Sequence, residues 1–526
     1  MKSYEYPDGY VKVREGILQG TIENGMHVFR GIPYAGAPVG DRRWKAPVPA
    51  PRWFGVRKAD RLVGAALQAD THALMPSEEL SAQYDSEDCL YLNIWTPAKK
   101  KSEKLPVFVW VHGGGMVAGT GMAPFFQGEK LAEKGIIVVT INYRLGLFGF
   151  LCTPELSAEA PQHTSGNYAL LDMRQALIWL RENISAFGGD PDCITVGGHS
   201  GGAAGVSCLL MSPLMKGLCK SVIIQSGCPA IGGMMDASSL PVMEQSGKEF
   251  MEKIGCHSLE ELRAMDGCDL IEASQKAGYV PNYTIDGWFL PDDTHALFSA
   301  GKFNDMNILV GSTSEEMGSF GFFHHPEIDP RRFEDYIRKT YPEELHEMLL
   351  KHYPHSTGPE AFLAVLRIIG DLMFLSPLLI GKVCAEKKQT CYVYLKTRPD
   401  PGIKGKECGS THSSELPYEF GRPQKCLINP AGMDEEEIRF GAALMNYWVS
   451  FIKFADPNRE QASVEWPLSE HELEYLDLGR EIHQPSESEK EIFRAFQKMM
   501  ADRGETNTRR YLDMTLIGKP DMFMPV

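Results

Sequence analysis

Residues 194–205 read Ile-Thr-Val-Gly-Gly-His-Ser-Gly-Gly-Ala-Ala-Gly. A β-branched run leads into Gly198-x-Ser200-x-Gly202, and small residues that can start a helix follow. A serine on a sharp turn between a strand and a helix is typical of a nucleophile elbow, in which glycines stand where a Cβ would clash. The helix then points its free N–H groups at the reacting centre. The pattern predicts a nucleophile at Ser200; the alternative is an ordinary glycine-rich turn.

A second glycine-rich motif lies upstream. The apolar run 106–111 reads as a buried strand, and His112–Gly115 follows it directly. Such a loop can supply backbone N–H donors to an oxyanion, because glycine lets the backbone approach a substrate oxygen closely. We expect the N–H groups of Gly114, Gly115 and Gly201 to form this oxyanion hole.

A serine nucleophile needs a base and a carboxylate that orients the base. Ten histidines follow Ser200, so position alone does not identify the base. His412 lies in a polar loop after the β-rich run 390–396, and we favour it. His324 and His325 are its rivals, and they lie in a phenylalanine-rich stretch.

The orienting acid is expected where a short strand ends. Residues 308–311 read Ile-Leu-Val-Gly, and Glu315 and Glu316 follow within five residues. Open α/β sheets carry functional residues at the carboxyl ends of their strands. Spacing alone does not separate Glu315 from Glu316.

Together these motifs resemble the type-B carboxylesterases, the family that includes bacterial para-nitrobenzyl esterases and the cholinesterases. The similarity covers most of the chain and includes the segments Gly31–Ala35, Ser86–Trp95, Asn142–Gly146, Gly166–Asp172 and Ala186–Pro191. The resemblance implies the α/β-hydrolase fold, in which a large, mostly parallel central sheet carries helical cap insertions. Residues 1–526 would then form one domain, with a mainly helical cap around residues 320–388.

The resemblance also assigns roles to individual residues. The family's nucleophile falls on Ser200, its acid on Glu316 and its histidine on His412. Ser226, within Ile224–Gly227, matches a serine thought to support the acid.

The chain departs from the family pattern at several positions. His199 precedes the nucleophile where Glu or Gln is usual, and we expect it to fill space and support the site. Gly201 follows where Ala is usual and keeps its N–H, whereas Met317 follows the acid where Gly is common. Cys89 matches a disulfide cysteine of the family, but residues 64–67 offer no partner, so we expect no bridge.

Composition narrows the function further. The net charge of −16 argues against nucleic-acid binding, and 43% hydrophobic residues are ordinary for a globular protein. The N-terminus has no apolar segment, and no stretch is expected to reach transmembrane length. Twelve cysteines without C-x-x-C spacing argue against zinc, and we expect them to be reduced. These features predict a cytoplasmic monomer or weak oligomer.

Apolar runs alternate with helical patterns, as in a doubly wound sheet. Strands are predicted at 91–96, 106–112, 136–141, 193–197, 220–225, 306–311 and 390–396. Helices are predicted at 167–187, 330–339, 343–352, 359–372 and 377–387, and a hairpin over 10–30. Four aromatic residues of the expected cap could line a pocket or pack in the core: Phe320, Phe322, Phe323 and Phe374.

The sequence thus predicts a serine esterase for small-molecule esters that uses neither cofactor nor metal. The alternatives are an amidase, peptidase or carbamate hydrolase on the same fold, and a non-catalytic cholinesterase-like binding protein. The latter is disfavoured because all three triad residues are present. Residues 55–83 contain no Phe, Tyr or Trp, and Glu79 stands where the resemblance places the choline-binding tryptophan, so we expect no preference for choline esters.

Overall fold

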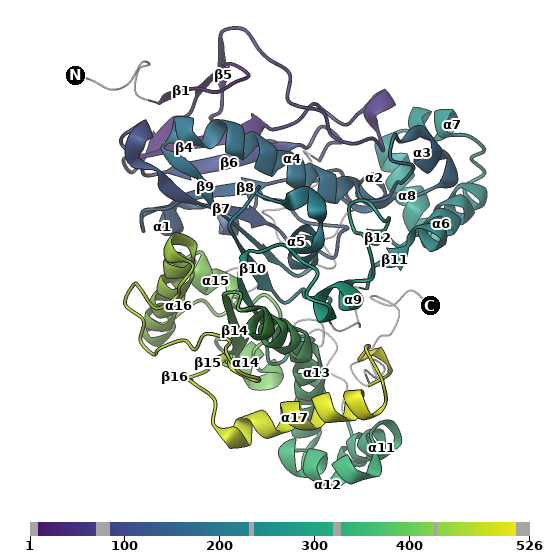
Figure 1. Cartoon of the computed structure of the whole chain (residues 1–526), viewed down its shortest axis with the longest axis vertical. Coiled ribbons are helices and arrows are strands. Elements are labelled where there is room, and N and C mark those ends of the chain that lie inside the picture. The colour runs from purple at the N-terminus through teal and green to yellow at the C-terminus, as the bar shows by residue number, and fades with distance from the viewer. Residues whose placement is uncertain (1–8, 70–84, 231–235, 319–327, 426–428, 512–526) are drawn as a thin grey trace. The chain divides into compact units, whose positions relative to one another are not determined.

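The computed structural model describes residues 9–69, 85–230, 236–318, 328–425 and 429–511, and it divides into two compact units. Unit 1 comprises Met1–Ile223, Ala237–Asp293 and Val449–Asp456. Unit 2 comprises Ile224–Asp236, Thr294–Trp448 and Pro457–Val526. Each unit has its own strands and helices (Figure 1). The single domain with a cap around residues 320–388 stays a prediction.

The sheet of unit 1 is parallel on the β9 side and antiparallel towards β3. Its strands follow the order β9-β7-β8-β6-β4-β3. They are β3 (Thr21–Glu23), β4 (Met26–Pro33), β6 (Tyr91–Thr96), β7 (Leu105–Val111), β8 (Ile137–Ile141) and β9 (Gly189–His199). Strand β7 pairs in parallel with β8 and β9, whereas β6 pairs antiparallel with β8 and β4. Strands β7 and β8 are apolar runs because both faces are covered.

The N-terminal hairpin predicted over residues 10–30 is confirmed only in its second half, because Tyr10–Lys12 and Ile17–Gln19 form a separate antiparallel pair in another sheet. Strands β3 and β4 pair antiparallel across Asn24 and Gly25, which both have positive φ, as a two-residue hairpin turn requires. The remaining strands of unit 1 are β1 (Tyr10–Lys12), β2 (Ile17–Gln19), β5 (Val56–Lys58), β11 (Ser238–Ser239) and β12 (Thr284–Ile285). Strand β10 (Ser221–Gln225) starts in unit 1 and ends in unit 2.

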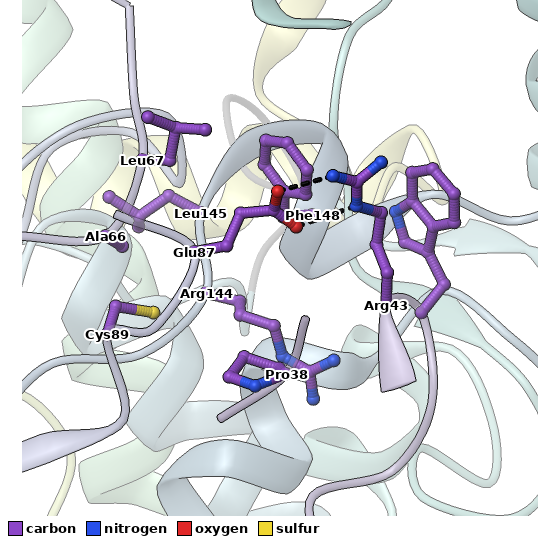
Figure 2. Close-up of a pocket in the computed structure, with 10 residues that line it drawn as sticks. Pro38, Arg43, Ala66, Leu67, Glu87, Cys89, Arg144, Leu145 and Phe148 are labelled. Atoms are coloured by element: carbon purple, nitrogen blue, oxygen red, sulfur yellow. Dashed lines mark hydrogen bonds and ion pairs between the residues drawn. The ribbon is translucent and has the colours of Figure 1, made fainter. Parts of the chain in front are cut away.

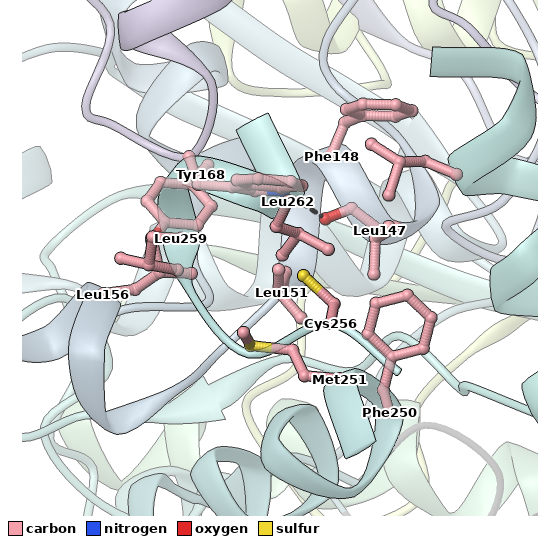
Figure 3. Packing of buried hydrophobic residues seen from close by; sticks show 12 residues of the cluster. Leu147, Phe148, Leu151, Leu156, Tyr168, Phe250, Met251, Cys256, Leu259 and Leu262 are labelled. Carbon is pink, nitrogen blue, oxygen red and sulfur yellow. Dashed lines mark hydrogen bonds between the residues drawn. The ribbon is translucent and has the colours of Figure 1, made fainter. Parts of the chain in front are cut away.

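The helices of unit 1 pack through apolar side chains. They are α1 (Glu129–Ala132), α2 (Gly146–Phe150), α3 (Pro154–Glu159), α4 (Tyr168–Asn183), α5 (Gly201–Met211), α6 (Leu240–Lys253), α7 (Leu259–Ala264) and α8 (Gly267–Ala277). Figure 3 shows one buried cluster, in which Phe148 of α2, Phe250 of α6 and Leu262 of α7 gather. This cluster fixes the outer helices on α2 and α4.

Unit 2 contains the strands that precede the candidate acid and base. They are β13 (Asn307–Thr313), β14 (Cys391–Lys396), β15 (Leu476–Leu478) and β16 (Ile482–His483). Strands β13, β14 and β15 pair in parallel, and β16 pairs antiparallel with β15. The carboxyl ends of β13 and β14 therefore meet at the same edge.

The longest helix of unit 2 corrects one prediction. The helices among its described residues are α9 (Thr294–Ser299), α11 (Pro330–Thr340), α12 (Glu343–His352), α13 (Gly358–Lys387), α14 (Ile403–Cys408), α15 (Leu416–Glu419), α16 (Glu435–Phe454, which ends in unit 1) and α17 (Glu487–Asp502). The prediction of separate helices at 359–372 and 377–387 is wrong, because α13 continues through Pro377. Proline removes one helical hydrogen bond, but the helix is buried along most of its length, and this packing outweighs the loss.

Helix α13 is also long and apolar enough to span a membrane, contrary to the expectation that no stretch reaches that length. However, 78% of its most apolar 18-residue window is buried in the structure, as in a core helix. Phe374 of this helix is fully buried against Tyr475 and Phe493, so it belongs to the core. Phe320, Phe322 and Phe323 lie outside the described residues.

Candidate active site

Ser200 lies at the predicted turn between β9 and α5. It caps the helix with φ 55° and ψ −127°, a conformation that residues with a Cβ rarely adopt. The turn is close against the end of β7, since a Cβ on Gly202 would stand 2.4 Å from the carbonyl oxygens of both Val111 and His112. The local backbone therefore matches the elbow that the sequence predicts.

His199 packs against the glycine-rich loop. It is buried, and a Cβ on Gly113 would stand 2.8 Å from its carbonyl oxygen and 3.3 Å from its Nδ1. The same Cβ would stand 3.1 Å from the Cβ of Ser200. Glycine at 113 thus gives His199 and Ser200 their room, in keeping with a space-filling role for His199.

The three predicted oxyanion donors also belong to unit 1. A Cβ on Gly201 would stand 3.0 Å from the backbone nitrogens of Gly115 and Met116, so the loop and the first turn of α5 are in direct backbone contact. Within residues 85–230, which the structure describes without a gap, the N–H groups of Gly114, Gly115 and Gly201 donate to no protein acceptor. An anionic oxygen is the acceptor that such a group of N–H donors favours.

His112, which starts the loop, is a structural residue. Its ring stacks on Tyr143 with centroids 4.4 Å apart, and its Nδ1 lies 2.8 Å from the carbonyl oxygen of Gly113. Burial lowers the pKa of His112 to about 4. The imidazole is therefore neutral at neutral pH and donates from Nδ1 to shape the turn.

The candidate acid and base contact each other in unit 2. Glu316 follows β13 and is buried, and its Oε2 is hydrogen-bonded to Nδ1 of His412. Its Oε1 accepts from the Ser226 hydroxyl at 2.6 Å and from the Thr313 N–H at 2.7 Å. Both carboxylate oxygens are thus held, and the imidazole is oriented through Nδ1.

The charges of this pair support each other. Burial alone would raise the pKa of Glu316, but the charge of His412 and the hydrogen bonds outweigh burial and lower it. Burial alone would lower the pKa of His412, and the negative charge of Glu316 outweighs it and raises that pKa. Glu316 is therefore ionised, and His412 binds a proton more readily than a free histidine.

Glu315, the rival for the acid, has a different task. Its Oε2 accepts from the Ser410 N–H at 2.7 Å, and its own N–H donates to the carbonyl oxygen of Ser410 at 3.0 Å. Its Oε1 lies 3.3 Å from a guanidinium nitrogen of Arg367, which also pairs with Asp371. Glu315 therefore joins the loop after β13 to the loop of His412.

Sequence reasoning missed several buried ionisable groups in β14 and in the segment after His412. Glu415 and Glu419 are fully buried, and burial raises their pKa values to about 7 and about 8. Lys396, the last residue of β14, is also buried. The signal for Lys396 in the sequence was a charged residue at the end of an apolar strand. Its hydrogen-bond partners, Ser410 and Ser414, lie 14 and 18 residues further along the chain, so the sequence pattern did not reveal them.

One cluster in the described residues has the composition of a metal site. Ligand atoms of Asp477, His483 and Glu489 lie within 4.8 Å of one another. Glu489 already accepts from Nε2 of His483 at 3.0 Å and from the backbone of Ser486, where it caps α17. These hydrogen bonds explain why the three side chains lie together: His483 and Glu489 form an ion pair at the start of α17.

A small cavity in unit 1 lies beside Cys89 and contains none of the candidate residues (Figure 2). Cys89 is a buried free thiol. In place of a disulfide, an ion pair between Arg43 and Glu87 holds the segment just before Cys89, and Nε of Arg43 lies 2.7 Å from Oε2 of Glu87. Ser86 also exchanges backbone hydrogen bonds with residues 65–67.

His324 and His325, the rival candidates for the base, lie outside the described residues. Glu79, which stands where the resemblance places the choline-binding tryptophan, also lies outside them.

The chain is similar to several known proteins over most of its length. Residues 7–496 match the Carboxylesterase family. The para-nitrobenzyl esterase of Bacillus subtilis is 32% identical over 94% of this chain and 99% of its own length. The fumonisin B1 esterase of Sphingopyxis macrogoltabida is 32% identical over 89% of this chain and 86% of its own. The crystal structure of a Geobacillus stearothermophilus carboxylesterase superposes with a TM-score of 0.80 at 30% identity, over 93% of this chain and 99% of that one.

Proposed function

The chain belongs to the carboxylesterase family, has the α/β-hydrolase fold and hydrolyses carboxylic esters, and we propose that it does so through an acyl-enzyme on Ser200. In this mechanism the Ser200 hydroxyl attacks the ester carbonyl while Nε2 of His412 takes its proton. His412 then gives the proton to the departing alcohol. Water attacks the acyl-enzyme by the same route and releases the acid.

The observation that carries the proposal is the bond between His412 and Glu316. A buried carboxylate that accepts from Nδ1 leaves Nε2 as the basic nitrogen, which is the tautomer that a serine nucleophile requires. Ser226 and Thr313 fix the carboxylate from its other oxygen. The negative charge also stabilises the imidazolium that forms during attack.

The oxyanion hole consists of the N–H groups of Gly114, Gly115 and Gly201. Their support is the backbone contact between Gly201 and Gly115, and the lack of a protein acceptor for the three groups within residues 85–230. Each such donor contributes on the order of a hundredfold to turnover in a related reaction.

The test is covalent labelling combined with turnover. A fluorophosphonate should label Ser200 in the wild type, and Ser200→Ala should lose hydrolysis of a para-nitrobenzyl ester while its melting temperature stays close to that of the wild type. Mass spectrometry with the adduct on another serine, together with an active Ser200→Ala, would show the assignment to be wrong.

The same chemistry could cleave amides or carbamates. Matched ester and amide substrates with the same acyl group should separate these activities, and we expect the ester to be hydrolysed faster. Para-nitrobenzyl esters are the natural first substrates, because a relative that matches 94% of this chain is named for them.

A further inference from the structure

Lys396 is a buried cation below the loop of His412. It ends β14, and its side chain has no exposure to solvent. Its ammonium donates to the carbonyl oxygen of Arg398 at 2.8 Å, to the Ser410 hydroxyl at 2.9 Å and to the Ser414 hydroxyl at 2.8 Å. A lysine has three N–H donors, so all of them are used.

The two serines bracket the candidate base. Ser410 precedes His412 by two residues, and Ser414 follows it by two. Lys396 therefore joins both ends of the five-residue turn that carries the imidazole. A single buried group that holds both ends limits the directions in which the turn can move.

An anion completes the cluster. Asp400 lies 3.9 Å from the Lys396 ammonium, and it forms a shorter ion pair with Lys404 at 2.9 Å. The same carboxylate accepts from the Thr411 N–H at 3.1 Å and from its hydroxyl at 2.6 Å. Burial lowers the pKa of Lys396, whereas Asp400 and Glu415 counteract this effect.

The turn itself is strained, which is why it needs such support. Ser413, directly after His412, has φ 73°, a left-handed conformation that few residues with a Cβ adopt. The Ser414 N–H donates to the carbonyl oxygen of Thr411 at 3.1 Å, so the chain reverses at His412. Strained residues of this kind persist only where their surroundings determine the conformation.

We propose that Lys396 is a positioning residue for His412, because it fixes the 410–414 turn on which the imidazole meets Glu316. This inference rests on the proposed role of His412 as the base. Lys396 does not exchange protons with the substrate; it acts through Ser410 and Ser414.

The test compares two ways of breaking the same contacts. Lys396→Met removes the ammonium at similar side-chain length, and a Ser410→Ala/Ser414→Ala variant removes its two hydroxyl acceptors. We expect kcat to fall about tenfold to 100-fold in Lys396→Met, as for the loss of hydrogen bonds to a charged group, with KM within about threefold. The double serine variant should fall in the same direction. Lys382→Met, which removes an exposed lysine paired with Glu472, is the matched control and should be unchanged.

Labelling by a fluorophosphonate distinguishes positioning from folding. A misplaced His412 lowers the labelling rate constant of every folded molecule. A merely structural role lowers only the fraction of protein that becomes labelled, and the melting temperature. We expect the rate constant and kcat to fall by similar factors, and the combined triple variant to be no slower than Lys396→Met, because the three residues act as one unit.

If Lys396→Met does not fold, the double serine variant decides the question by the same two measurements. Rate constants within twofold of the wild type in the folded variants would overturn the proposal. That result differs from failure of the proposed function, in which the wild type itself would not be labelled at Ser200.

Discussion

Replacing Glu316 by glutamine tests the arrangement around His412 most directly. In the wild type one carboxylate oxygen accepts from Nδ1 of His412, and the other accepts from Ser226 and Thr313. Glutamine has a single carbonyl oxygen, and these last two donors hold it. Its amide NH₂ then faces Nδ1, donates to it and leaves the imidazole proton on Nε2. Nε2 is the nitrogen that must accept the proton of Ser200, so the tautomer is wrong for catalysis.

The size of the loss follows from that reversal. The equivalent change in a serine protease lowers kcat by about 10⁴, which corresponds to about 5.4 kcal/mol, and we expect a similar loss for Glu316→Gln. Glu315→Gln is the matched control. It keeps a carbonyl acceptor for the Ser410 N–H and loses only the charge paired with the partly exposed Arg367. Glu315 makes no contact with His412, so its loss should lower kcat by no more than about fivefold, or about 1 kcal/mol.

The assay is kcat for one para-nitrobenzyl ester in both variants, with circular dichroism and melting temperature as controls for folding. Glu316→Gln should lose on the order of a thousandfold more activity than Glu315→Gln. Equal losses in two folded variants, or a larger loss in Glu315→Gln, would refute the assignment of the acid.

Three further predictions concern pH, the oxyanion hole and substrate choice. His412 must be neutral to act as the base, and the charge of Glu316 raises its pKa, so kcat/KM should fall as the pH drops below a midpoint that lies above about 6.5. In Glu316→Gln this midpoint should move to lower pH, and an unmoved midpoint would contradict the prediction. Gly201→Ala should lower kcat about tenfold, because the alanine Cβ would displace the backbone nitrogens of Gly115 and Met116. This loss is smaller than that for removing a whole N–H donor. An unchanged kcat would show that the loop adapts freely. Choline esters should have no advantage in kcat/KM over neutral esters of the same acyl group, and a tenfold preference would contradict the prediction from the loop sequence.

Most of the longer strands were predictable because their signal is local, whereas short strands such as β15 and β16 were not predicted. The apolar run at Tyr91–Thr96 has the predicted bounds, and β7, β8 and β13 differ from prediction by one or two residues at an end. The continuity of helix α13 was not predictable, because a proline ordinarily ends a helix and only burial in the core keeps Pro377 inside this one. Tertiary packing overrides local preference there, and no sequence window contains that information.

The candidate site was predictable only in part, for a similar reason. The motifs around Ser200 and the glycine loop are contiguous in sequence. Glu315 and Glu316 are adjacent, and only the contacts of their side chains, one with Ser410 and one with His412, give them different tasks. The partners of a buried side chain such as Lys396 come from a loop whose path the sequence pattern does not reveal.

The backbone at Ser200 has a consequence for evolution and engineering. A serine with φ 55° and ψ −127° destabilises the folded state by about 1–3 kcal/mol, whereas glycine adopts this conformation freely at an entropic cost of about 0.5–1 kcal/mol. Ser200→Gly should therefore melt at a higher temperature than the active protein. Selection for turnover and selection for folding oppose each other at this one position, so a lineage that no longer needed the reaction would gain stability by losing its nucleophile.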